Sequence, residues 1–372
     1  MIALLRCNAI SNDPRVKKYL NYIEEKNIDY HILGWDRNEE NLELRNCTFF
    51  KRKSGYNVGG IKAAWNRILW MWFCFKELSR IKPNFIHGCD LDSAFPAVMY
   101  KIFRNRRVKV LFDVFDWFSA TLYNQPKIIT LAFKAMESLT TKHSDHILIC
   151  EKEREDQIPY DVSDKIDILP NIPMVRDEST FKYKDKSLMF PNENITISYV
   201  GGLYGERFLD ELLDIAEKGY VNLLIAGFGD DRIEKRCVEI SKKENVKYLG
   251  GVSYELGLHI AFHSDVIYAM YCKTNPNHIY AAPNKYYEAM LLGKPIITTE
   301  GTIVGEKVKI NNTGFVVNED KLELENLLLA LKSMPEVILQ NGENAKKLWE
   351  TEFSTYTIDF LQNKYNNYIF SD

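Results

Sequence analysis

The stretch AAPNKYYEAMLLGKPIITT, residues 281–299, predicts a short helix followed directly by a strand. Asn284 is a good helix cap, Gly293 ends the helical pattern, and a proline follows two residues later. Residues 296–299 are β-branched and apolar or small, as expected of a buried strand. A helix that leads straight into a buried strand is half of the unit from which parallel α/β sheets are built.

Lys285 lies in the first turn of this predicted helix, where the partial positive charge of the helix end repels a cation. An anion bound at the helix start would remove this conflict. Glu288 lies three residues further along the same face, so the two side chains could hold two parts of one ligand, a phosphate and a pair of hydroxyls. The alternative is a surface Lys–Glu pair of little energetic weight.

Short apolar segments alternate with amphipathic segments along the whole chain. The expected strands are 2–6, 29–34, 84–88, 108–114 and 146–150 in the first half, and 195–202, 221–229, 246–251, 265–270 and 295–299 in the second. This alternation predicts an α/β protein with two doubly wound parallel sheets, each covered by helices on both faces. We expect a first domain at 1–172, a polar linker at 173–193, a second domain at 194–346 and a last helix at 347–372.

Composition excludes several classes of protein. The 372 residues are 46% hydrophobic and 27% charged, with a net charge of −3, as in ordinary globular proteins. Residues 1–175 carry a net +4 and residues 176–372 a net −7, which argues against a nucleic-acid binder but leaves room for an anionic surface near the first half. Seven scattered cysteines without a Cys-x-x-Cys argue against a disulfide framework or a metal site. The longest apolar run, 68–75, is far shorter than a membrane span, so we expect a cytoplasmic protein.

A second cation lies where another predicted strand ends. The segment YVGGLYGER, 199–207, places Gly201 and Gly202 directly after a strand and Arg207 at the start of the next helix. Glycines let the backbone approach a bulky anion, and a helix start favours phosphate. A second glycine turn, AGFGDD at 226–231, is better explained as a structural turn before a helix. Arg207 and Lys285 thus form a candidate diphosphate clamp, with Glu288 beside it for a ribose.

Several segments together resemble one family. They are NDPRVKKYL (12–20), HGCDLDSAFPA (87–97), FDVFD (112–116), GGLYGER (201–207) and PNKYYEAMLLGKPII (283–297). With them the chain resembles, over nearly its whole length, the family-four retaining glycosyltransferases of the GT-B fold, most of all those that build bacterial surface polysaccharides. The resemblance implies two Rossmann-like domains facing a central cleft, with the last helix crossing back to the first domain.

The resemblance also implies a reaction. A nucleotide-diphosphate sugar, as substrate and with no cofactor or metal ion, would bind the second domain through Gly201, Gly202, Arg207, Asn284, Lys285 and Glu288. A hexosyl group would pass with retention to a lipid-linked saccharide on the first domain, where Asp116 and Asp90 are the candidate catalytic residues. Helix capping at strand ends is the alternative for these two aspartates. Asp113 and His87 are more simply explained as structural.

The chain departs from the family pattern at three positions. Tyr280 stands where many members have the first Glu of a Glu-x7-Glu motif, Phe115 stands where a His is common, and Cys89 precedes Asp90 where a His is frequent. These departures keep two alternatives open. One is a non-catalytic subunit that binds nucleotide-sugar, and the other is a nucleotide-sugar epimerase of the same fold.

The helix predicted at 59–80 is apolar on every side for two turns and contains Trp65, Trp70 and Trp72. Such a helix packs in a core or lies at a membrane interface, where Trp and basic residues are favoured. Basic clusters at 51–53 and 101–109 lie in the same half. A lipid-linked acceptor would explain all three features through peripheral contact with an anionic membrane, on its inner face.

Overall fold

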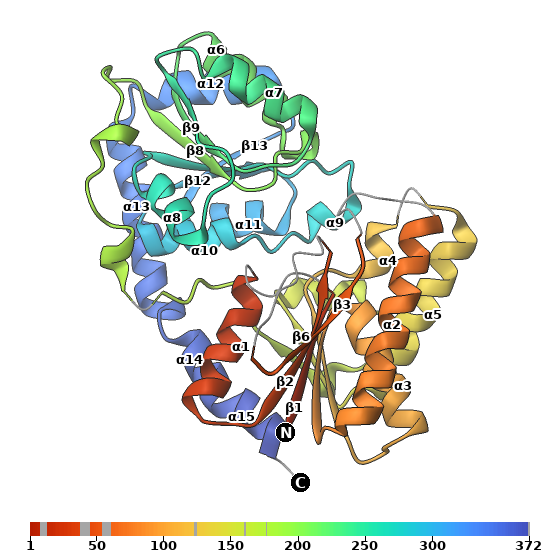
Figure 1. Ribbon diagram of the computed structural model, residues 1–372. Coiled ribbons are helices and arrows are strands. Elements are labelled where there is room, and N and C mark those ends of the chain that lie inside the picture. Colours follow the sequence, from red (N-terminus) through yellow and green to blue (C-terminus); the bar gives the residue numbers. More distant parts are fainter. Residues whose placement is uncertain are drawn as a thin grey trace. The chain divides into compact units, whose positions relative to one another are not determined.

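The computed structural model describes residues 1–7, 13–37, 45–53, 61–122, 125–159, 161–175 and 177–370. Asn12 and residues 59–60, which begin two of the segments discussed above, lie outside the described residues. The chain divides into two compact units, one formed by 1–170 with 357–372 and the other by 171–356 (Figure 1).

The first unit is built on a seven-stranded sheet with the order β3-β2-β1-β4-β5-β6-β7, in which every described pairing is parallel. Its strands are β1 (Ile2–Arg6), β2 (Tyr30–Asp36), β3 (Cys47–Lys51), β4 (Phe85–Cys89), β5 (Lys109–Val114), β6 (His146–Ile149) and β7 (Ile166–Ile168). One face carries α2 (Ile61–Ile81), α3 (Leu91–Phe103), α4 (Phe118–Thr121) and α5 (Lys127–His143) (Figure 1). The other carries α1 (Pro14–Glu25) and the end of the chain: α14 (Tyr356–Phe360), η8 (Leu361–Tyr365) and α15 (Asn366–Phe370).

The second unit is built on a six-stranded parallel sheet with the order β10-β9-β8-β11-β12-β13. Its strands are β8 (Thr196–Val200), β9 (Asn222–Ala226), β10 (Val246–Tyr248), β11 (Val266–Ala269), β12 (Ile296–Thr299) and β13 (Gly314–Val317). One face packs against α6 (Leu209–Glu217), α7 (Asp231–Ile240) and α12 (Lys321–Leu331). The other packs against α8 (Tyr254–Phe262), α10 (Asn284–Leu292), α11 (Ile303–Asn311) and α13 (Pro335–Leu348).

Helices on both faces explain why the central strands are apolar at consecutive positions rather than at alternate ones. All five residues of β9 are buried, and so are the first four of β1. Each large apolar side chain buried in this way contributes about 1.5–3 kcal/mol to folding. The prediction of two doubly wound sheets is confirmed.

Three edge strands, β3, β7 and β13, have no counterpart among the expected strands. Each is at most five residues long and mostly half-buried, so its hydrophobic signal is weak. Residues 173–193, expected to be a linker, lie in the second unit, where Phe181 and Leu188 are buried. Of the expected last segment, only the part from Thr357 onward belongs to the first unit. No helix in the described part of the chain is long and apolar enough to cross a bilayer.

Candidate functional site

The turn after β8 brings the backbone close to a cation of another element. Gly201 has φ +151°, and a Cβ at this position would lie 2.8 Å from the Lys285 Nζ. Gly227, after the neighbouring strand β9, has φ +141°, and its Cβ would lie 1.8 Å from the Gly201 carbonyl oxygen. A larger residue at Gly227 would therefore collide with backbone, and one at Gly201 would be strained by its φ and would displace the Lys285 ammonium. As expected, the turn at 226–231 is structural, since it packs against the Gly201 turn backbone to backbone.

Lys285 is the second residue of α10. The helix begins at Asn284 with Pro283 in the cap position, so the prediction that Asn284 caps the helix is wrong by one residue. Proline suits this position because its fixed φ is compatible with a helix start and no N–H is needed there. The Lys285 Nζ lies 4.9 Å from the ring centroid of Tyr199, the residue two before Gly201. The cation therefore points back toward the glycine turn.

The charge state of Lys285 is sensitive to its surroundings. Burial lowers the pKa of its ammonium group to about 8, and the Arg207 guanidinium acts in the same direction, whereas Glu288 opposes both. In the part of the chain that the structure describes, neither Lys285 nor Arg207 forms an ion pair with a carboxylate. Two cations near enough to disfavour each other, neither of them in an ion pair within the described residues, form a site prepared for an anionic ligand.

Arg207 ends the single turn η6 (Gly205–Arg207) and is held from two sides. Its guanidinium carbon lies 4.4 Å from the ring centroid of Tyr271, and Nη1 lies 3.4 Å from His278 Nε2. The other ring nitrogen of His278 lies 2.9 Å from the carbonyl oxygen of Cys272, so it carries the proton and Nε2 accepts from Arg207. These contacts fix the guanidinium direction beside the Gly201 turn.

Glu288 lies one helical turn after Lys285. Burial raises the pKa of its carboxyl group, while Lys285 and the Tyr254 hydroxyl act against the rise. Burial likewise raises the pKa of Tyr254, and Glu288 adds to that rise. The structure thus brings two cations, one carboxylate and three tyrosines to the carboxyl edge of the second sheet. The tyrosines (199, 254 and 271) and His278 were not identified from the sequence, because no spacing separates them from core aromatics.

The first unit brings Asp90 and Asp116 together at the carboxyl ends of β4 and β5. Asp90 adopts φ 64° and ψ 169°, a conformation that costs a non-glycine residue about 1–3 kcal/mol. Its side chain makes no helix-capping hydrogen bond, so the capping alternative is wrong for Asp90. Instead it accepts hydrogen bonds from Arg6 and, at 3.0 Å, from the backbone N–H of Phe115. Burial raises the pKa of Asp90 to about 6, although Arg6 opposes the rise.

Asp116 is the exposed member of this pair. Its Oδ1 accepts a hydrogen bond of 3.2 Å from Nη2 of Arg154, whose side chain is buried. The ring of Phe115, the residue in place of a family His, lies 4.1 Å from the guanidinium carbon of Arg6 and 5.2 Å from that of Arg15. An aromatic ring between two guanidinium groups is held by cation–π attraction. The surroundings of residue 115 therefore favour an aromatic ring, and they give no role to a side chain that transfers protons.

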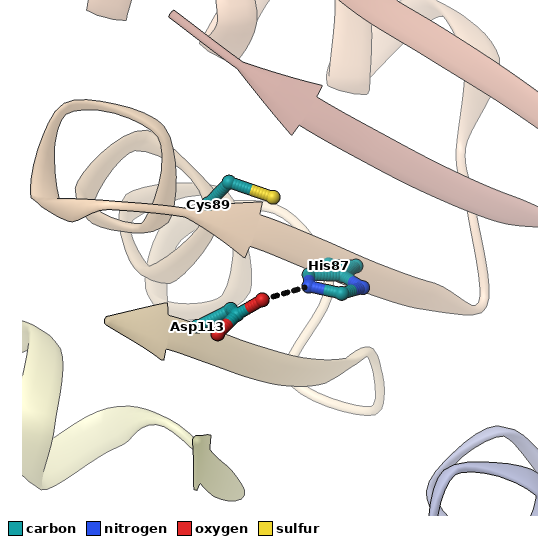
Figure 2. A group of neighbouring side chains, drawn as sticks. All are labelled: His87, Cys89 and Asp113. Carbon is teal, nitrogen blue, oxygen red and sulfur yellow. Dashed lines mark hydrogen bonds and ion pairs between the residues drawn. The ribbon is translucent and has the colours of Figure 1, made fainter. Parts of the chain in front are cut away.

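His87, Cys89 and Asp113, from the neighbouring strands β4 and β5, form a compact buried group (Figure 2), with one potential ligand atom from each within 4.8 Å of the others. Asp113 already accepts hydrogen bonds of 2.7 Å from Arg15 and from Tyr19, and its Oδ2 lies 3.3 Å from His87 Nε2. Burial alone would raise the pKa of Asp113, but Arg15 and His87 together outweigh it and hold that pKa well below its usual range.

The donor set of this group does not suit a metal ion. The second ring nitrogen of His87 lies 3.0 Å from the Tyr365 hydroxyl, and burial raises the pKa of the Cys89 thiol, which therefore stays protonated. A divalent cation would also lie beside the Arg15 guanidinium. Hydrogen bonding accounts for His87 and Asp113, which are structural, as expected.

Comparison with known proteins gives a consistent result. Residues 194–333 match the family model described as Glycosyl transferases group 1. No curated protein matches the chain by sequence. Among solved structures, sucrose-phosphate synthase from Thermosynechococcus elongatus is similar with a TM-score of 0.71 and 14% identity, covering 99% of this chain and 98% of that one.

Two further structures extend the likeness. HepE from Anabaena, solved in complex with UDP and glucose, has a TM-score of 0.69 and 12% identity, with 96% of each chain covered. WaaG, a glycosyltransferase involved in lipopolysaccharide biosynthesis, has a TM-score of 0.70 and 12% identity over 100% of both chains. Such likenesses establish the GT-B fold, and the family match concerns residues 194–333 of the second unit. The chain therefore has the GT-B fold, and residues 194–333 of its second unit match the family described as Glycosyl transferases group 1.

Proposed function

We propose that the protein transfers a hexosyl group, with retention of configuration, from a nucleotide-diphosphate sugar to a lipid-linked saccharide at the surface of an anionic membrane. The observation that carries the donor part is the pair of cations Lys285 and Arg207 at the Gly201 turn: Arg207 disfavours the charge of Lys285, and neither forms an ion pair with a carboxylate in the described part of the chain. Charge-assisted bonds from both would hold the diphosphate, and Glu288 would accept from the ribose hydroxyls. HepE, solved with UDP and with UDP-glucose, supports a donor of this class.

In the proposed reaction the bond between the anomeric carbon and the diphosphate oxygen breaks, and a bond to the acceptor oxygen forms on the same face of the sugar. The acceptor proton passes to the departing diphosphate oxygen, so no strong protein base is needed. Lys285 and Arg207 stabilise the charge that develops on the diphosphate, which removes the need for a divalent cation. Phe115, which stands where a His is common, cannot accept a proton, and this route does not require it to do so.

The acceptor part of the proposal rests on Asp90 and Asp116. Asp116 is exposed and Asp90 half-buried, and both lie at one edge of the first sheet, where ligands of such sheets bind. WaaG, which acts in lipopolysaccharide biosynthesis, supports a saccharide acceptor carried by a lipid.

The decisive experiment has two stages. A panel of nucleotide-sugars is screened by thermal shift, because a bound donor raises the melting temperature by mass action. The best donor is then tested for transfer to a lipid-linked saccharide in the presence of EDTA, and the anomeric configuration of the product is determined by NMR. Transfer with retention in EDTA is expected. A reaction that stops in EDTA and returns with Mg²⁺ or Mn²⁺ would overturn the metal-independent mechanism.

A non-catalytic nucleotide-sugar-binding subunit remains the second candidate, favoured by Phe115 and Tyr280. Donor binding would be retained in that case, but neither transfer nor donor hydrolysis would exceed background. Free epimerised donor without an acceptor would instead identify an epimerase.

We predict that Asp116→Asn lowers turnover at least about tenfold. Good orientation of the reacting groups can lower the activation barrier by roughly 7–11 kcal/mol, and misplacing them loses part of that reduction. The stability of the protein is expected to stay unchanged, since the Asp116 side chain is 58% exposed. Cys89→Ala is the control from the same sheet edge and should leave the reaction rate nearly unchanged. Full turnover in Asp116→Asn would show that the acceptor lies elsewhere. Activity that emerges only in Phe115→His would favour the non-catalytic subunit.

Donor binding is predicted to weaken as the pH rises above about 8, the value to which burial and Arg207 lower the pKa of Lys285 in the empty site. A bound diphosphate favours the charged ammonium, so binding takes up a proton, and affinity falls by up to about tenfold per pH unit. Calorimetry of nucleoside diphosphate binding between pH 6.5 and 9.5 measures the effect. Lys285→Arg is the matched control, because guanidinium does not titrate there and its profile should be flat. Identical profiles in the two proteins would rule out Lys285 as a phosphate ligand.

A further inference from the structure

Helix α2 exposes large apolar side chains along one line of its surface. Trp65, Ile68 and Trp72 are 55%, 53% and 60% exposed, and their spacing of three and four residues places them on the same helix face. Trp70 points the opposite way and is fully buried against the first sheet, with its ring 6.0 Å from that of Trp35. The helix therefore packs into the core by one face, and no element in the described part of the chain covers the side chains of Trp65, Ile68 and Trp72.

The neighbouring helix α3 continues this surface. Its last residue, Phe103, is 69% exposed. The next residue, Arg104, has its guanidinium carbon 5.7 Å from the ring centroid of Phe75, and that ring stacks on Trp72 at 6.0 Å. We call Trp65, Ile68, Trp72 and Phe103 the outer aromatic face. Exposed apolar surface gathered in this way on a globular protein marks an interaction site.

Positively charged side chains lie next to the outer aromatic face, at the C-terminal ends of α2 and α3. Residues 101–109 contain five Lys and Arg and no acidic residue. Of these, Arg104, Arg106 and Arg107 are exposed, and on α2 Lys76 and Arg80 are exposed as well. The only nearby acidic residue of α2 is Glu77, which pairs with Arg80. The surface thus joins tryptophans to an excess of positive charge.

We propose that the outer aromatic face docks on an anionic lipid bilayer, with α2 lying in the plane of the membrane interface. Tryptophan rings favour the boundary between headgroups and acyl chains, and Lys and Arg bind lipid phosphates. A protein partner fits less well, because each exposed cation would need an acidic partner placed opposite it, whereas an anionic bilayer presents phosphates over its whole surface. A second copy of the chain would bring like charges together.

The proposed orientation also serves the chemistry, and it rests on the lipid-linked acceptor proposed above. Arg67 follows Trp65 by two residues, and its Nε lies 3.6 Å from Oδ2 of Asp92. Asp92 is the second residue of α3, and Asp90 directly precedes that helix. The Trp65 end of the outer aromatic face therefore lies at the same sheet edge as Asp90. A saccharide held by its lipid at the bilayer surface would meet the first unit at that edge.

The test is sedimentation with vesicles of phosphatidylcholine alone or with 30% phosphatidylglycerol. The wild type should bind the anionic vesicles, and high salt should weaken binding because salt screens exposed charges. Trp65→Ser with Trp72→Ser, and separately Arg106→Glu with Arg107→Glu, should each lower the bound fraction about tenfold. Ile310→Ser with Leu339→Ser is the matched control, since both are large apolar side chains of the second unit that are even more exposed than the two tryptophans, and it should bind as the wild type does.

Equal sedimentation of the tryptophan variant and the wild type would overturn the proposal, and so would failure of the wild type to bind anionic vesicles. Concentration-dependent dimerisation that is lost in the tryptophan variant would identify a second copy as the occupant instead, and overturn it too. Donor binding by thermal shift keeps this result separate from the proposed function, because the tryptophan variant should bind nucleotide-sugar normally. If the wild type shows no donor binding in the thermal-shift screen, the proposed function is overturned, whereas the result on vesicle docking is unaffected.

Discussion

Replacing Lys285 by Met is expected to weaken nucleoside diphosphate binding at least about tenfold, and Arg207→Ala is expected to do the same. Each charge-assisted hydrogen bond to a phosphate is worth roughly 1.5–3 kcal/mol, so one lost bond costs a factor of ten or more. The double variant should lose about a hundredfold. Isothermal titration with nucleoside diphosphate measures all three.

The empty protein should melt no lower in Lys285→Met than in the wild type. Burial disfavours the Lys285 ammonium, and the attraction of Glu288 offsets only part of that cost, since the pKa of Lys285 stays lowered. Lys294→Met is the matched control, because burial also lowers the pKa of Lys294 although it lies beyond the other end of the same helix. It should bind the diphosphate as the wild type does. Wild-type affinity in both Lys285→Met and Arg207→Ala would rule out the proposed clamp.

The largest effect on stability is expected at Asp113. Asp113→Ala should lower the free energy of unfolding by about 3–5 kcal/mol, because it leaves the Arg15 guanidinium buried without its carboxylate. Both side chains are nearly inaccessible, at 0% for Asp113 and 5% for Arg15. Urea denaturation measures the change, and Asp164→Ala, which removes an exposed carboxylate of the same unit, is the control that should be nearly neutral.

If Asp113→Ala does not fold, Asp113→Asn keeps the test open, since the amide retains the shape and part of the hydrogen bonding. The stability that Asp113 provides should also depend on pH. Because the pKa of this carboxyl is lowered in the folded state, its contribution is present above its ordinary value of 3.8 and is lost as the pH falls below it. Unchanged stability in both variants would contradict the structural role. Melting that rises with added zinc would show that His87, Cys89 and Asp113 bind a metal after all.

The sequence by itself determined the features that depend on local order along the chain. The alternation of buried strands and amphipathic helices predicted both sheets, because central strands covered on two faces are apolar at every position. It also placed Lys285 and Glu288 on one face of one helix, since that relation depends only on helical spacing. The edge strands β3, β7 and β13 escaped detection for the converse reason: they are short and half-buried, so little of their burial is recorded in the sequence.

Only the tertiary structure decided which residues of distant elements meet. Nothing local shows that Gly201 leaves room for the Lys285 ammonium, that Tyr271 lies under Arg207, or that Asp90 accepts from Arg6. The same holds for the tryptophan helix, whose sequence is apolar all round. Packing against the first sheet buried Trp70 and left Trp65 and Trp72 exposed, because a sheet can cover only one side of a helix. Burial, and the pKa shifts and partners that follow from it, belongs to the folded chain as a whole, whereas periodicity belongs to each segment alone.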